Sequence, residues 1–258
     1  MGKLRTNKIF LSLMLAIAGI LGGPCIFAGS VRLAWDISPD QNVIGYHVYR
    51  STESGKNFSR INPFLVRVPW YTDTSAASGN TYYYAVTAQS KSGLESALSD
   101  EVLAHIPPNQ PPVANDDKWA TFIDTPVSIP VLDNDVDPEG DRISIIGIIS
   151  AGHGRVGLSS DLGIKYSPAT GFLGTDLFHY IIYDGEKVSN WATVLIAVRL
   201  PGDVNGNGRV ELDDVNAIAS SLRSPASGPA DPRDLDQDGW ITISDLQKAY
   251  SRCENCSQ

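Results

Sequence analysis

The most constraining feature of this sequence is a twelve-residue polar stretch that occurs twice near the C-terminus. "DVNGNGRVELDD" (residues 203–214) and "DLDQDGWITISD" (residues 234–245) align position by position without a gap. Both have oxygen-bearing side chains at positions 1, 3, 5, 9 and 12, glycine at position 6 and an apolar residue at position 8. One such stretch could be an ordinary polar turn. Its repetition indicates a shared structural role.

The repeated stretch has the ligand spacing of a calcium loop. Calcium takes about six to eight oxygen ligands, and such loops supply them from positions 1, 3, 5, 7, 9 and 12, with position 7 using its backbone carbonyl. We therefore expect two calcium ions, one in each loop. The predicted ligands of the first are Asp203, Asn205, Asn207, the Arg209 carbonyl, Glu211 and Asp214. Those of the second are Asp234, Asp236, Asp238, the Trp240 carbonyl, Thr242 and Asp245.

A helix is expected after each loop, and none before it. Apolar residues follow at the spacing i, i+3, i+4, i+7 of one helix face: Val215, Ile218, Ala219 and Leu222, then Leu246, Ala249, Tyr250 and Cys253. The segments that enter the loops, "IAVRLPG" and "SPASGPADPR", contain proline and glycine, which stop helices. The repeating unit is therefore a loop followed by a helix.

Two such units, over residues 202–258, resemble a type I dockerin. The resemblance implies structural calcium and a cohesin-like protein domain as partner. In that family loop positions 10 and 11 recognise the partner, which here assigns the role to Leu212, Asp213, Ile243 and Ser244. These residues depart from the family's hydroxyl-rich pattern, and the segment between the repeats is longer, so the identity of the partner stays open.

Residues 30–106 consist of short alternating runs separated by Gly and Ser turns, which predicts a β-sandwich. "LAWDIS", "IGYHVYRS" and "SGNTYYYAVTAQSKSGLES" resemble a fibronectin type III domain. The resemblance implies that Trp35 lies in the core and that Tyr82 is the corner tyrosine of a late strand. A proline-rich linker, residues 107–111, is expected to be extended and semi-rigid.

Residues 112–200 are again all strand in pattern. "PPVANDD", "PVSIPVLDNDVDPEGD" and "ATVLIAV" resemble bacterial cadherin-like, immunoglobulin-type repeats. The acidic residues Asp133, Asp135 and Asp137 leave two interpretations open, a further calcium ion or ordinary turn formation. The predicted fold class is thus multidomain, with two all-β immunoglobulin-like sandwiches followed by a small α-helical domain of two EF-hand-like loop–helix units.

The N-terminal residues 1–28 have a basic start, a short apolar run and small residues near Ala28, which predicts a secretory signal peptide. We expect a secreted or cell-surface protein that is not an integral membrane protein; a lipid anchor at Cys25 is the less favoured alternative. Removing the leader leaves 17 basic and 29 acidic residues, so nucleic acid and anionic membranes are poor partners.

Cys253 and Cys256 predict a local disulfide or a buried thiol.

No catalytic motif stands out. "GHGRVG" (residues 152–157) satisfies the GxGxxG fingerprint, but no helical pattern follows it, so we interpret its glycines as turn residues and His153 as a loop histidine. We expect a non-catalytic modular protein that docks to a cohesin-like partner, in a polysaccharide-degrading or cell-surface assembly. The alternative is a carbohydrate-binding or adhesive surface protein whose calcium domain is a structural cap, with Trp70, Trp119 and Trp191 as candidate sugar-stacking residues.

Overall fold

The computed structural model describes residues 11–14 and 30–256. The chain divides into two compact units. One comprises Met1–Pro111 with Asp137–Arg142 and Gly185–Lys187, and the other comprises Pro112–Val136, Ile143–Asp184 and Val188–Gln258. The first contains one β-sandwich, and the second contains another β-sandwich and a small helical module.

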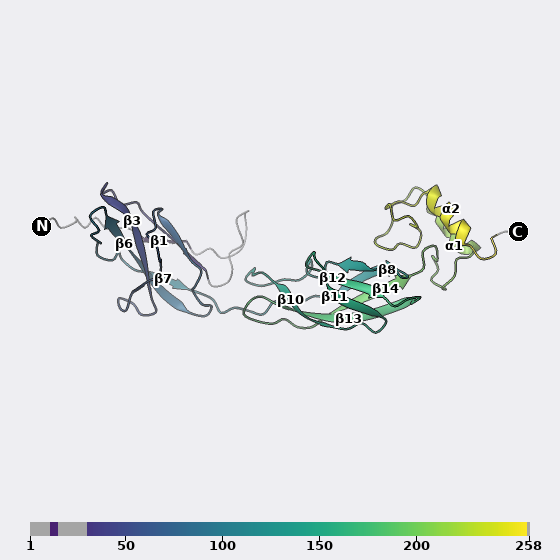
Figure 1. Ribbon diagram of the computed structural model, residues 1–258, viewed down its shortest axis with the longest axis horizontal. Coiled ribbons are helices and arrows are strands. Elements are labelled where there is room, and N and C mark those ends of the chain that lie inside the picture. The colour runs from purple at the N-terminus through teal and green to yellow at the C-terminus, as the bar shows by residue number, and fades with distance from the viewer. Residues whose placement is uncertain (1–10, 15–29, 257–258) are drawn as a thin grey trace. The chain divides into compact units, whose positions relative to one another are not determined.

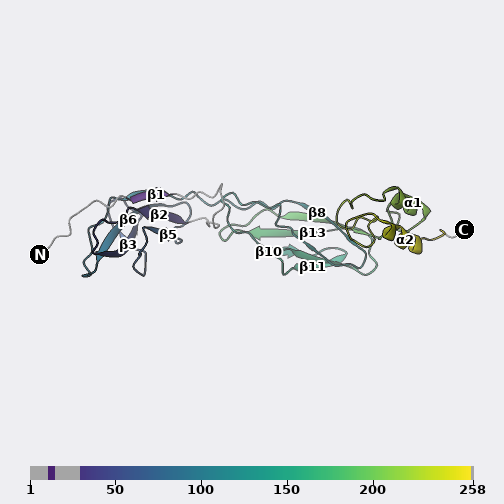
Figure 2. The same cartoon turned by 90° about the horizontal axis from the view of Figure 1, so that it is seen from above.

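The first sandwich packs a three-stranded sheet against a four-stranded one (Figure 2). The first sheet has the order β1 (Leu11–Met14), β2 (Val31–Trp35), β5 (Trp70–Asp73). The second has the order β4 (Ser59–Arg60), β3 (Val43–Ser51), β6 (Thr81–Ser90), β7 (Val102–His105). Alternating residues of β2 and β6 point inward, because successive side chains of a strand face opposite sides.

Both residues singled out by the fibronectin resemblance lie in this core. Trp35 is buried and packs edge-on against Tyr46, with ring centroids 5.3 Å apart. Tyr82 is buried, and its hydroxyl oxygen accepts a hydrogen bond from the Ala77 N–H at 3.1 Å. The expected core position of Trp35 is therefore confirmed, and Tyr82 ties its strand to the preceding corner.

The predicted leader falls mainly outside the described residues, as does its expected cleavage point after Ala28. Four of its residues, Leu11–Met14, form β1 and pair antiparallel with β2. In a chain without the leader, β2 would lack β1 as its neighbour on this edge.

The second sandwich is also built from two sheets (Figure 1). One has the order β10 (Ser144–Ile149), β13 (Gly174–Tyr183), β14 (Ala192–Arg199), β8 (Asp117–Phe122), with β14 and β8 parallel. The other has the order β11 (Gly154–Leu158), β12 (Ile164–Pro168), β9 (Val127–Ile129). Its core takes Phe178, Tyr180 and Ile182 from β13 and Val194, Ile196 and Val198 from β14.

The interpretation of "GHGRVG" is correct in excluding a nucleotide-binding helix and wrong about two glycines. Gly154 and Gly157 lie inside β11, which leads directly into β12. A Cβ on Gly154 would lie 2.4 Å from the ring of the buried Tyr166, so that position is restricted by packing. His153 stacks on Phe172, with ring centroids 4.4 Å apart.

The helical module contains α1 (Leu212–Ser220) and α2 (Ile243–Arg252), which lie side by side (Figure 1). Its small core is formed by Val215, Ile218, Leu235, Ile241 and Ala249. The predicted apolar helix faces include residues that the helices do not bury. Ala219 and Tyr250 are exposed, and Leu222 follows the end of α1. Each helix has only two or three turns and buries a narrow stripe. In the described part of the chain, no helix has the length and apolar character needed to cross a bilayer.

Candidate metal centre

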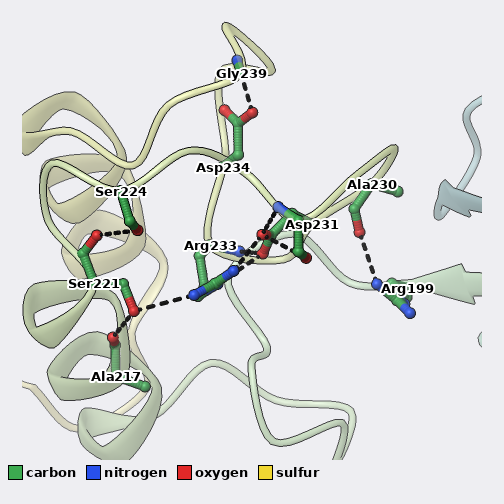
Figure 3. Close-up of polar contacts among 10 residues, drawn as sticks. Arg199, Ala217, Ser221, Ser224, Ala230, Asp231, Arg233, Asp234 and Gly239 are labelled. Atoms are coloured by element: carbon green, nitrogen blue, oxygen red, sulfur yellow. Dashed lines mark hydrogen bonds and ion pairs between the residues drawn. The ribbon is translucent and has the colours of Figure 1, made fainter.

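The aspartate at position 1 of each loop accepts hydrogen bonds from several backbone N–H groups of that loop. The Asp203 carboxylate accepts hydrogen bonds from Gly206 N at 2.7 Å, Asn207 N at 3.1 Å and Gly208 N at 2.7 Å. In the second loop, Asp234 accepts from Asp238 N at 3.2 Å and Gly239 N at 2.9 Å. Figure 3 shows the bond between Asp234 and Gly239. A polar loop with few backbone partners of its own is thereby held around one buried carboxylate.

The aspartate at position 12 closes each loop from the first turn of the following helix. Asp214 accepts from Val204 N and Asn205 N through Oδ1, and from Glu211 N through Oδ2. Asp245 accepts from Leu235 N and Asp236 N through Oδ1, and from Thr242 N through Oδ2. Each donor of the first loop thus has its counterpart at the same loop position in the second. Position 12 is therefore also the N3 residue of a capping box that begins the helix.

The backbone of the two loops repeats as well. Gly208 and Gly239, at position 6, have φ of 86° and 88°. Position 4 is also left-handed in both loops, with φ of 77° at Gly206 and 60° at Gln237. Glycine adopts this region without a Cβ penalty, whereas Gln237 does so at a cost. The glycine at position 6 thus has a conformational reason in both loops.

The second loop gathers three carboxylates that could hold a metal ion. One carboxylate oxygen each from Asp234, Asp236 and Asp245 lies within 4.8 Å of the others. Oδ1 of Asp236 is buried and has no hydrogen-bond partner among the described residues. Hard oxygen donors in this number are the ligands that calcium prefers. The donor set therefore fits a divalent cation.

The electrostatics of this group differ from one carboxylate to the next. Burial raises the pKa of Asp234, and the neighbouring charge of Asp245 acts in the same direction. Hydrogen bonds from Ser244 and Lys248 lower the pKa of Asp236, and Lys248 Nζ lies 3.0 Å from Asp236 Oδ2. A bound cation would offset the clustering of negative charge that disfavours ionised Asp234.

The first loop has fewer charges than the second at the equivalent positions. Asn205 and Asn207 stand where the second loop has Asp236 and Asp238. Asn207 Nδ2 donates to Glu211 Oε2 at 3.1 Å, and Asn207 Oδ1 accepts from Arg209 N at 2.9 Å. Glu211 thus faces into the loop, while Thr242, its counterpart, accepts a hydrogen bond from Ser244 N and caps α2.

The two halves of the module are joined by a reciprocal pair of backbone hydrogen bonds. Arg223 N, after α1, donates to the Ile241 carbonyl of the second loop at 2.8 Å. Glu254 N, after α2, donates to the Val210 carbonyl of the first loop, also at 2.8 Å. Donors and acceptors again occupy equivalent positions in the two repeats. Each position-8 residue is therefore paired with the chain that leaves the other helix.

The cysteine pair lies at the second of these contacts. Cys253 and Cys256 form a disulfide that encloses Glu254, and both pack against the module's small core. The Tyr250 hydroxyl donates to the Cys256 carbonyl at 2.8 Å. Of the two states predicted from the sequence, the structure has the local disulfide.

The segment between the repeats contains an ion pair that was not predicted from the sequence. Asp231 is buried and forms hydrogen bonds with the Arg233 guanidinium at 2.6 and 3.0 Å (Figure 3). Ser227 donates to the same carboxylate through N and Oγ, and Arg233 also reaches Ser221 Oγ. These bonds outweigh burial and hold the pKa of Asp231 well below its usual range. The segment "SPASGPADPR" is therefore held in place by Asp231. Its Asp-Pro-Arg sequence is the feature from which this ion pair could have been predicted.

The four predicted partner-contacting residues occupy the first turns of the helices. Leu212 and Asp213 lie in α1, Ile243 and Ser244 in α2, and all four are exposed. Leu212 retains 52% and Ile243 64% of its accessible surface. Single exposed apolar side chains are ordinary at protein surfaces, so this exposure shows only that the four positions are accessible.

The acidic residues Asp133, Asp135 and Asp137 do not form an equivalent group. The grouping of three metal-capable carboxylates found in the second loop is not repeated at Asp133, Asp135 and Asp137 in the described residues. Asp135 accepts hydrogen bonds from Asn115 N at 2.7 Å and the buried Tyr180 hydroxyl at 3.0 Å. Burial raises the pKa of nearby Asp117 to about 6. Asp137 accepts hydrogen bonds from Glu139 N and Asp141 N, as turn-forming aspartates do.

The candidate sugar-stacking tryptophans differ in exposure. Trp70 and Trp191 retain 46% and 50% of their accessible surface. Trp119 is partly buried against the core of the second sandwich, and its Nε1 is fully buried. Trp119 therefore packs against the core and is less accessible to a sugar than Trp70 and Trp191.

Comparison with known proteins gives a family match for one segment of the chain and partial similarity to several other proteins. The chain is 40% identical over 77 residues to an amylopullulanase of Thermoanaerobacter thermohydrosulfuricus; the match spans 30% of this chain and only 5% of that enzyme. An Fn3-like protein from Clostridium thermocellum is 34% identical over 32% of this chain and 82% of its own, with a TM-score of 0.28. A pectate lyase from Erwinia chrysanthemi is 20% identical over 46% of this chain and 35% of its own, with a TM-score of 0.31. Residues 109–197 match the family described as a bacterial Ig domain, which supports an Ig-like fold for the second sandwich.

Proposed function

We propose that residues 202–258 form a calcium-dependent docking module of the type I dockerin kind, which attaches the β-sandwiches to a cohesin-like domain of another protein. The observation that carries this proposal is the repetition of the whole loop framework in the two repeats, from the position-1 and position-12 carboxylates to the position-8 backbone bonds. A polar turn formed by chance would not reproduce these partners twice.

Calcium in this module is structural. The core of the module has five buried apolar residues, which is little for an independently folded domain. A ligand that binds only the folded state stabilises it by about 2.7 kcal/mol at a hundredfold excess over its dissociation constant. Two ions would therefore supply much of the stability that the core lacks. An additional ion near Asp133, Asp135 and Asp137 is a separate, weaker prediction.

The two sandwiches act as spacer or adhesion modules in this proposal. We infer a fibronectin type III domain for residues 30–106 and a cadherin-like Ig domain for residues 112–200. The partial identity to an amylopullulanase supports a place in a polysaccharide-degrading system. The protein is secreted or held at the cell surface, non-catalytic, and does not bind nucleic acid.

The partner surface comprises the exposed first turns of both helices, Leu212, Asp213, Ile243 and Ser244. The full chain is immobilised and exposed to secreted and envelope proteins of the source organism, with calcium or with a chelator. Recovery of a protein bearing a cohesin-like domain, only with calcium, is the expected result. The double variant Leu212→Asp/Ile243→Asp should lose it, whereas Leu158→Asp, an exposed change in the second sandwich, should not. Equal capture by both variants would exclude this surface.

A carbohydrate-binding role is the second candidate, because Trp70 and Trp191 expose about half of their surface. Exposed tryptophan rings provide the apolar faces on which sugars stack. Polysaccharide-retardation gels of Trp70→Ala and Trp191→Ala test it, with Trp119→Phe as a control inside the fold. Unchanged mobility of the unmodified chain on every glycan would rule out this role.

A further inference from the structure

The first calcium-type loop contains two asparagine–glycine pairs, whose reactivity is separate from the ligand role that the proposed function gives to Asn205 and Asn207. Asn205–Gly206 and Asn207–Gly208 are adjacent, and all four residues are exposed. The second loop has Asp236–Gln237 and Asp238–Gly239 at these positions, so it carries no such pair. We propose that Asn205 and Asn207 are sites of spontaneous deamidation, and that Asp203 restrains the reaction by holding both glycine nitrogens.

The chemistry requires only the chain and water. The backbone nitrogen of the following residue loses its proton and attacks the asparagine Cγ, forming a C–N bond. The bond from Cγ to the side-chain nitrogen breaks, and ammonia leaves with the transferred proton. Water then opens the succinimide at either carbonyl, giving aspartate or isoaspartate. Glycine in the second position favours the attack because it has no side chain to obstruct the ring.

The structure places both attacking nitrogens against one buried carboxylate. Gly206 N lies 2.7 Å from Asp203 Oδ1, and Gly208 N lies 2.7 Å from Asp203 Oδ2. Asp203 is only 6% exposed, so it does not readily turn away. A charge-assisted hydrogen bond directs each N–H toward Asp203, and the carboxylate disfavours the amide anion that the attack requires. Asp203 is therefore a positioning residue that slows deamidation.

Deamidation would change the loop in two ways. At Asn207 a new carboxylate would replace the amide that donates to Glu211 Oε2 at 3.1 Å, so an attractive contact would become a repulsive one. Isoaspartate would add a methylene group to the backbone and displace the N–H groups that now meet Asp203. Without a bound cation, deamidation would therefore weaken the first loop. The effect on calcium rests on the proposed function, whereas the restraint by Asp203 does not.

Trypsin offers a direct readout, because cleavage after Arg199 and Arg209 releases residues 200–209 with both asparagines and no other. The full chain is incubated at mildly alkaline pH, with calcium and with a chelator, and this peptide is followed by mass spectrometry for conversion of amide to acid. A synthetic peptide of residues 200–209 gives the unrestrained rate. We expect the folded chain to react at least about tenfold more slowly, the effect of one hydrogen bond to a charged group.

Asp203→Asn should bring the rate at Asn205 and Asn207, distinguished from the new residue 203 by fragmentation of the peptide, close to that of the free peptide. Asp73→Asn, which removes a buried and hydrogen-bonded carboxylate from the first sandwich, is the matched control and should leave residues 200–209 protected. Equal rates in the unmodified chain and Asp203→Asn, or in the chain and the peptide, would overturn the proposal. Equal acceleration by both variants would assign protection to overall folding and would also overturn the role of Asp203. If calcium makes no difference while Asp203→Asn still accelerates, the calcium proposal fails and this one holds.

Discussion

At the scale of single residues, buried aspartates organise the first sandwich and the helical module. Asp203 and Asp234 hold the two loops, Asp231 clamps the segment between them, and Asp73 anchors the first sandwich. Each is buried and accepts hydrogen bonds from backbone N–H groups, hydroxyls or a guanidinium. A buried carboxylate is tolerable only with such partners, so removing one is costly.

Asp73 predicts a pH dependence of the first sandwich. It accepts from the Arg50 guanidinium at 2.8 Å, the Tyr84 hydroxyl at 2.8 Å and Ser75. Burial opposes ionisation, but the hydrogen bonds from Ser75 and Tyr84 and the charge of Arg50 lower the pKa of Asp73 overall. Because the folded pKa is below the unfolded one, this stabilisation is present above about pH 4 and is lost as the pH falls through the folded value.

We expect Asp73→Asn to reduce the unfolding free energy near neutral pH by about 3 kcal/mol, since it leaves Arg50 without its charge partner. The loss should shrink as the pH falls below about 4. Urea unfolding at several pH values, followed by tryptophan fluorescence, measures both. Asp36→Asn, at an exposed site of the same sandwich, is the control. A loss that is the same at every pH would contradict the assignment.

At the scale of elements, the helical module combines two local loops with contacts between them. The two loops follow from local spacing, so their repetition could be predicted from the sequence, whereas their calcium ligands stay a prediction. The bonds from Arg223 to Ile241 and from Glu254 to Val210 join distant segments, and no local pattern signals them. Packing explains two other differences from the sequence predictions. Gly154, predicted as a turn residue, lies in a strand and is confined by the Tyr166 ring. Tyr250, predicted on the buried face of its helix, faces solvent because α2 buries only one narrow stripe.

The disulfide should stabilise the contact between α2 and the first loop. Cys256→Ser frees the segment that carries Glu254, and we expect a lower thermal midpoint for the helical module. The effect should be smaller than the roughly 3 kcal/mol of a 15-residue disulfide loop, because this ring is short. Far-UV circular dichroism with and without a dithiol reductant measures it. Reductant should lower the thermal midpoint of the unmodified chain and leave that of the double variant Cys253→Ser/Cys256→Ser unchanged. Identical midpoints for all forms would exclude a stabilising role of the disulfide.

At the scale of the whole molecule, two β-sandwiches with large apolar cores are joined in one chain to a module with a small one. The sequence periodicity was sufficient to predict both sandwiches, because alternating runs define strands wherever they pack. The order of the strands in each sheet, including the parallel pairing of β14 with β8, depends on long-range contacts that periodicity does not encode.

This division predicts that calcium affects one part of the chain selectively. Chelation should lower the thermal transition that reports on α1 and α2 and leave the β-sandwich transitions in place. Calorimetry of the full chain, paired with circular dichroism, separates these transitions. Uniform shifts of every transition, or none at all, would contradict a calcium requirement confined to the module.

The most direct test of the central claim is calcium titration of the full, chelator-stripped chain by isothermal calorimetry. We predict two bound ions, with one lost in Asp203→Ala and one in Asp234→Ala. Circular dichroism should show helix forming over the same range of calcium concentration. Absence of binding heat together with unchanged helicity, or a stoichiometry that neither variant alters, would contradict the assignment of these loops as the calcium sites.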